Sequence, residues 1–109
     1  MQTPLTTEAP AVQRLVNRIA DEVHPLQIIM FGSTARGTSG PDSDVDLLVV
    51  VPEGTHRRRT AQHLYRTIRS DSVPFDLVVA TPSDLARHRN NPGLIYHSIL
   101  REGRTVYAA

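Results

Sequence analysis

Apolar positions in the first quarter of the chain recur every three or four residues, which is the spacing of one helix face. They are Val12, Leu15, Val16, Ile19 and Val23. Pro10 suits the first turn of such a helix, because proline lacks the N–H that would need a partner there. The residue before Pro25 is pushed out of the helical region, so the helix ends at that point. The pattern therefore predicts an amphipathic helix at the start of the chain.

Continuous apolar runs rich in isoleucine or valine are typical of buried strands. Such runs cover residues 26–31, 45–51 and 75–80. The second run ends in three consecutive valines before Pro52, so we expect it to be buried on both faces of a sheet.

Helical spacing returns over residues 55–70. The apolar stripe of this segment consists of Ala61, Leu64, Tyr65 and Ile68. Most of its arginines fall on the opposite, solvent side, and these are Arg57, Arg58, Arg59, Arg66 and Arg69. The arginines at 57–59 favour a solvated face, with a surface for a protein partner or RNA as the alternative.

The last third of the chain predicts two short helices and an edge strand. Thr81 is a helix cap, and Asp84 reaches back toward the start of that helix. A last helix covers residues 94–102, Gly103 fits its C-terminal cap, and residues 105–108 form the edge strand. The order of elements predicts one α/β domain over residues 1–109, with a small mixed sheet flanked by helices.

Composition excludes several kinds of chemistry. All twelve basic residues are arginine, so no lysine is present to form a Schiff base or a P-loop. The chain has no cysteine, which removes disulfides and thiolate metal sites. A net charge of +1 gives no reason to expect a stable nucleic-acid partner, and no apolar run is long enough for a membrane span. With no signal-peptide pattern, we expect a soluble, cytoplasmic domain.

Two carboxylates mark the start of the second strand. Asp44 and Asp46 are two residues apart, so both side chains point to one face of the sheet. That face continues with Leu48 and Val50, which places the acids where the strand leaves the core. Carboxylates held so close repel one another unless a cation lies between them. Mg²⁺ commonly binds one or two carboxylates together with phosphate oxygens.

A glycine turn and a third acid are predicted to reach the same edge. Gly32 and Ser33 end the first strand, where glycine allows close approach of a phosphate and the serine hydroxyl adds a donor. If the first two strands are antiparallel, this turn lies beside Asp44 and Asp46. A helical crossover makes the second and third strands parallel, which brings Asp76 to the same end.

The segments GSTARGTSGPDSDVDLLVV and FDLVV resemble the DNA polymerase beta-like nucleotidyltransferase superfamily, in particular its minimal members, which are usually encoded beside a HEPN-domain partner. The resemblance implies that superfamily's fold. It further implies that Gly32 and Ser33 hold a triphosphate and that Asp44 and Asp46 bind two Mg²⁺ ions. Asp76 would ligate the catalytic ion and help to deprotonate the acceptor hydroxyl.

By this resemblance the chain transfers a nucleotide, AMP from ATP, to a hydroxyl acceptor. The acceptor would be a tyrosine of a HEPN toxin, which makes this chain the antitoxin. Two alternatives stay open: an antitoxin that only binds its partner, and an enzyme that modifies a small molecule such as an antibiotic.

Rival motifs fit less well. A calcium loop starting at Asp42 needs glycine at its sixth position, where the chain has Leu47. The glycines at 32 and 37 imitate a P-loop without its lysine, and the histidines lack the spacing of a zinc site. Arg36 is placed to touch phosphate, although its position in the motif fixes no role.

Overall fold

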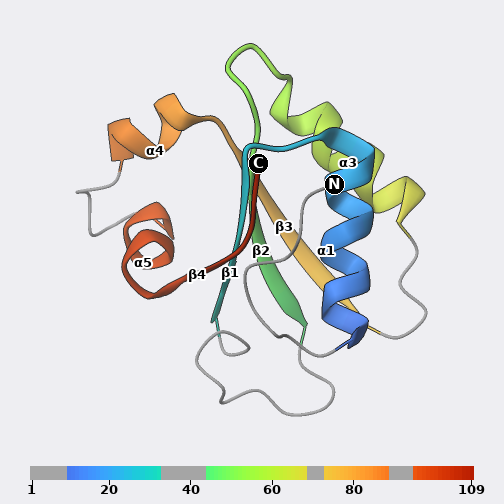
Figure 1. Ribbon diagram of the computed structural model, residues 1–109. Helices are drawn as coiled ribbons and strands as arrows, with labels where there is room; N and C mark the ends of the chain where they lie inside the picture. Colours follow the sequence, from blue (N-terminus) through green and yellow to red (C-terminus); the bar gives the residue numbers. More distant parts are fainter. Residues whose placement is uncertain (1–9, 33–43, 69–72, 89–94) are drawn as a thin grey trace.

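The computed structural model describes residues 10–32, 44–68, 73–88 and 95–109 (Figure 1). Its elements are α1 (Pro10–Val23), β1 (Gln27–Phe31), β2 (Val45–Val50), α3 (Arg57–Thr67), β3 (Phe75–Ala80), α4 (Pro82–His88), α5 (Ile95–Glu102) and β4 (Arg104–Ala108). The predicted α/β class is confirmed. Within the described residues, predicted and observed elements differ at their ends, most clearly in α3, which begins at Arg57 although the predicted helix begins at residue 55.

The four strands form one mixed sheet in the order β3-β2-β1-β4. β1 is antiparallel to both β2 and β4, whereas β2 and β3 are parallel. The parallel pair requires a crossover, and α3 provides it. The antiparallel first pair, the parallel second pair and the short edge strand all agree with the sequence-based expectation.

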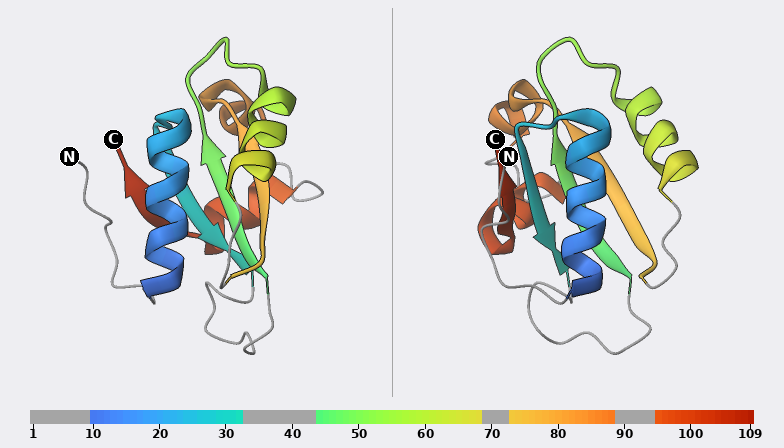
Figure 2. Two further views of the ribbon diagram at one scale, coloured as in Figure 1. Left: turned by 90° about the vertical axis from the view of Figure 1, so that its right-hand side faces the viewer. Right: turned by 45° about the vertical axis from the view of Figure 1, so that its right-hand side comes forward.

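Helices cover both faces of the sheet. α1 and α3 lie on one side and α4 and α5 on the other, as Figures 1 and 2 show. The larger core, on the α1 side, includes Leu47 and Val49 of β2, whereas Leu48 and Val50 belong to the smaller core on the α5 side. β2 is therefore buried on both faces, as its run of valines predicts.

Two residues of the predicted core lie outside it. Leu26 precedes β1, and its side chain is 41% exposed although its backbone still bonds to Val50. Tyr65 was placed on the apolar stripe of α3 but is 46% exposed. Its ring lies against β3 and its hydroxyl accepts a backbone hydrogen bond there, so the tyrosine serves the edge of the sheet rather than the core.

Gly103 ends α5 as expected, and its N–H donates to the Ile99 carbonyl at 2.7 Å. The backbone φ of Gly103 is not positive. Among the described residues, positive φ values occur at His24, Gly32 and Gly54. A Cβ at Gly103 would lie 2.5 Å from Cγ2 of Ile29. The glycine is therefore required because the end of α5 packs directly against β1.

Thr81 caps α4 and Asp84 reaches back to it, as predicted: the Asp84 N–H donates to Oγ1 of Thr81 at 3.3 Å. Oδ2 of Asp84 accepts hydrogen bonds from the N–H and hydroxyl of Thr81, at 2.9 and 3.0 Å. The Arg57 guanidinium donates to the same oxygen at 2.8 Å. The hydrogen bonds from Thr81, and then the charge of Arg57, lower the pKa of Asp84 against the opposing effect of burial. Arg57, placed on a solvated face by its sequence, thus joins α3 to α4.

Replacing Asp84 by alanine is expected to reduce the free energy of unfolding by about 1–3 kcal/mol at neutral pH, because buried donors lose their acceptor. Since the folded-state pKa is lowered, the carboxylate stabilises the fold above its unfolded-state pKa, and this contribution is lost as pH falls through the folded-state value. Urea denaturation at neutral and acidic pH measures both effects. Asp84→Asn, which retains one acceptor oxygen, is the matched control and should cost less. An alanine variant as stable as the wild type would contradict this account.

No helix in the described part of the chain is long and apolar enough to cross a membrane.

Candidate active site

The sheet brings two of the predicted acids into direct register. Asp46 of β2 is paired with Asp76 of β3 on one side and with Phe31, the last residue of β1, on the other. β2 and β3 both begin at the lower end of the sheet in Figure 1. Neighbouring strands are about 4.8 Å apart, so the two aspartates occupy adjacent positions across the pair.

Both acids lie on the face of the sheet that α4 and α5 cover. Side chains alternate along a strand, so Asp46 shares its face with Leu48 and Asp76 shares its face with Val78. Leu48 and Val78 belong to the smaller core or pack against it. The acids therefore extend this face beyond the core, with Asp46 half-buried and Asp76 exposed. Asp44 is exposed just before β2, where alternation points it the same way.

Gly32 fits against the Asp46 carboxylate in a way that only glycine permits. Its φ of +77° lies in the left-handed region, which L side chains rarely adopt. A Cβ at this position would overlap Oδ2 of Asp46 and lie 3.3 Å from its Cγ. The structure thus brings together Gly32, Asp46 and Asp76, three of the predicted site residues, from three consecutive strands.

The surroundings of Asp46 disfavour its charged form. Burial raises the pKa of Asp46, and the negative charges of Asp76 and then Asp44 raise it further. Hard oxygen donors that repel one another are the donor set that a divalent cation neutralises, so these residues fit Mg²⁺. Within the described residues, no three acidic or histidine side chains form a ready-made metal cage. An incomplete set of this kind suits a cation that takes further oxygens from a phosphate.

Two expectations about the site lie outside the described residues. They are the phosphate contact of Ser33 and the role of Arg36.

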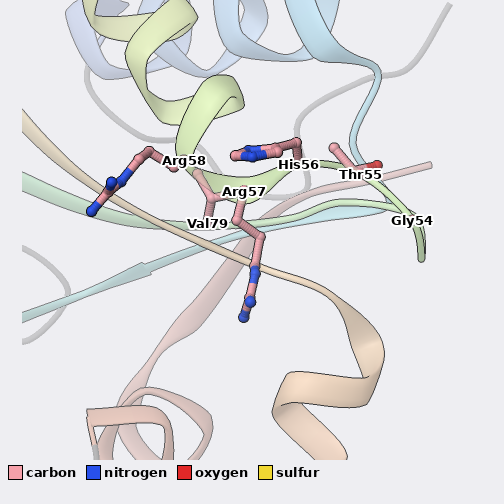
Figure 3. A pocket seen from close by; sticks show the side chains of 6 residues that line it. All are labelled: Gly54, Thr55, His56, Arg57, Arg58 and Val79. Atoms are coloured by element: carbon pink, nitrogen blue, oxygen red, sulfur yellow. The ribbon is translucent and has the colours of Figure 1, made fainter.

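The arginines at 57–59 lie at the other end of the sheet. A hollow of about 620 Å³ is found there, lined by Gly54, Thr55, His56, Arg57, Arg58 and Val79 (Figure 3). Val79 is three residues along β3 from Asp76, roughly 10 Å away, and packs on the opposite face. The hollow is therefore separate from the acids, which occupy an open edge of the sheet.

Sequence reasoning missed the neighbour of Asp76 on α3. Tyr65 contacts the residues on both sides of Asp76, through a hydrogen bond to Leu77 and a stacked ring on Phe75. Helical periodicity assigned this tyrosine to the core. The hydroxyl was the available signal, because a tyrosine on the border of an apolar stripe usually directs its polar end to a partner.

Comparisons with known proteins bear on the family and the fold. The model of the nucleotidyltransferase domain family matches residues 12–103. A chain from a toxin–antitoxin crystal structure with AMP-PNP has a similar fold, with a TM-score of 0.56 and 21% identity over 88% of this chain and 73% of that one. A presumed nucleotidyltransferase from Sulfolobus solfataricus has a TM-score of 0.50 and 22% identity, covering 76% and 84% of the two chains. No curated protein sequence matches the chain.

Proposed function

The chain belongs to the nucleotidyltransferase domain family, and from this premise we propose that it transfers AMP from ATP to a hydroxyl group of a partner protein. The observation that carries the proposal is the register of Asp46 with Asp76, with Gly32 packed against Asp46 and Asp44 two residues away. Paired acids beside a glycine turn, at the open end of a sheet, are suited to holding a metal-bound triphosphate.

Each residue has a distinct role in this proposal. Asp44 and Asp46 would hold two Mg²⁺ ions, and Gly32 and Ser33 would hold the triphosphate. When bound, the ions would neutralise charge that develops on the phosphate oxygens. Asp76 would be a further ligand to an ion and would accept the proton of the acceptor hydroxyl. The hydroxyl oxygen attacks the α-phosphorus, the bond to the bridging oxygen breaks, and pyrophosphate leaves.

The open edge supports a protein as the acceptor. Asp76 is exposed on β3, which is an edge strand of the sheet. Within the described residues, this edge offers little to orient a small acceptor, whereas an interface with a protein holds a side-chain hydroxyl in place. We propose a tyrosine of a HEPN-domain toxin as that acceptor, so that this chain acts as an antitoxin. The similar fold in a toxin–antitoxin structure makes a partner of this class the first to test.

The expected result with a HEPN partner is a mass increase of one or more AMP groups. The partner is mixed with this protein, ATP and Mg²⁺, and both proteins are measured by intact-mass spectrometry. EDTA should prevent the modification. The double variant Asp44→Asn, Asp46→Asn is the matched control, because it keeps the shape of the site and removes its charge.

Two other outcomes would replace the proposal. A stable complex without a mass increase, which protects against the toxin equally well with the double variant, would make this chain a binding module. Rapid modification of a free small molecule such as an aminoglycoside, with the partner unchanged, would make it a small-molecule nucleotidyltransferase.

A further inference from the structure

Among the described strands, the one that carries Asp76 has a sheet neighbour on one side only. β3 is the edge strand next to β2. The Pro74 carbonyl accepts a hydrogen bond from the Val45 N–H at 2.9 Å. The Ala80 carbonyl accepts one from the Val51 N–H at 2.8 Å. Backbone groups alternate in direction along a strand, so even-numbered residues of this segment face β2 and odd-numbered ones face outward. The backbone of Asp76 is thus held by β2, and the N–H of Leu77 points away from the sheet.

Tyr65 meets this outward-facing edge. Its hydroxyl accepts a hydrogen bond from the Leu77 N–H at 2.7 Å. Its ring stacks on Phe75, with ring centroids 5.5 Å apart and planes inclined by 4°. One side chain therefore holds the residue before Asp76 by stacking and the residue after it by a hydrogen bond.

We propose that Tyr65 is a positioning residue, which fixes the Asp76 carboxylate for proton removal from the acceptor. Phe75 and Leu77 face the larger core, so Tyr65 holds the strand from the face opposite to the Asp76 side chain. Asp76 and Asp46 are adjacent like charges, and their repulsion disfavours the pairing of β3 with β2 at this position. The two contacts of Tyr65 hold β3 in place against this repulsion. This inference rests on the proposed function.

The test is Tyr65→Phe, which removes the acceptor oxygen and keeps the ring on Phe75. With partner, ATP and Mg²⁺, we expect kcat to fall about tenfold, the lower end of effects for groups that orient functional ligands. The KM for ATP should change by less than about twofold, because Tyr65 does not touch the nucleotide site. Tyr65→Leu removes the stacked ring as well and should lower kcat further, by about a hundredfold.

A second measurement follows the hydrogen bond between Tyr65 and Leu77 directly. Amide hydrogen exchange at Leu77 should become faster in both variants, because its N–H loses its partner. Tyr96→Phe is the matched control. Tyr96 stacks on His88 in the α4–α5 layer, on the face of the sheet opposite to Tyr65, and removing its hydroxyl should change neither kcat nor the exchange of Leu77.

Three outcomes would overturn the inference while the proposed function stands: wild-type kcat in Tyr65→Phe, a change confined to the KM for ATP, or an equal loss of kcat in Tyr96→Phe. Unchanged exchange at Leu77 would remove its structural basis. If the wild-type protein transfers no AMP, the proposed function fails and the inference fails with it.

Discussion

Asp46→Asn is expected to lower nucleotide transfer by at least about a thousandfold while the protein stays folded. The carboxylate supplies negative charge to the proposed metal site, and a loss of about 4 kcal/mol of transition-state stabilisation corresponds to this factor. Asn keeps the shape of Asp, so Gly32 can still pack against it. Asp44→Asn should behave similarly. Pyrophosphate release and partner mass measure the effect, and near-normal turnover in either variant would exclude the metal-site assignment.

Asp46→Asn also tests how the charge of Asp46 affects the free energy of unfolding. The pKa of Asp46 is raised in the folded state, so the fold favours its protonated form and loses stability as pH rises through the raised value. Without metal and nucleotide, Asp46→Asn should therefore increase the free energy of unfolding at neutral pH, by up to about 1 kcal/mol. The gain should vanish near about pH 3, where the wild-type carboxyl is protonated. Urea denaturation at the two pH values tests this. A decrease at neutral pH would show that the ionised carboxylate stabilises the fold.

The topology could be predicted because local patterns leave few arrangements. Each short apolar run is a strand, and the helix at 55–70 forces the second and third strands to be parallel. The Asp-x-Asp spacing at the start of β2 then fixes the face of Asp46, and parallel pairing brings Asp76 beside it. The two-residue period of side chains along a strand and the helical crossover between β2 and β3 are thus sufficient to place these two acids together.

Contacts between distant side chains could not be predicted in this way. Arg57 and Asp84 are 27 residues apart in the sequence, and their ion pair depends on how α3 and α4 sit at the end of the sheet. The hydrogen bond of Tyr65 likewise depends on which odd-numbered N–H of β3 lies beneath the tyrosine. Helical periodicity gives the direction of a side chain within a helix, and it does not give the residue that the side chain meets.

The two glycines Gly32 and Gly103 show what the sequence can and cannot predict about close packing. At Gly32 the end of a strand beside paired acids indicated a close approach, and the structure has both a positive φ and a carboxylate in the space of a Cβ. At Gly103 the sequence indicated the C-terminal cap of a helix, and the structure adds close packing against Ile29, which the sequence did not indicate. A glycine at a helix end is explained by either cause, and only tertiary structure separates them.

Asp76→Asn is expected to lower kcat by about a hundredfold to a thousandfold and to change ATP affinity by less than about threefold. In the proposed reaction Asp76 accepts the proton of the attacking hydroxyl, a contribution of this size for a well-placed general base. Asp44, Asp46 and the turn at Gly32 remain to hold the nucleotide, so binding should persist. A loss of kcat without a loss of ground-state binding identifies an interaction made in the transition state.

The measurement pairs single-turnover transfer to the partner with a separate titration of ATP and Mg²⁺. Asp21→Asn is the matched control, because Asp21 is an exposed acid on α1 and its replacement changes net charge by the same amount. Asp76→Asn should also gain stability without metal, since one of the two charges that raise the pKa of Asp46 is removed. If the substitution weakened ATP binding and left the rate at saturation unchanged, Asp76 would be a nucleotide-binding residue. The general base would then have to come from the partner or from solvent, because Asp46 and Asp44 would be engaged with the metal.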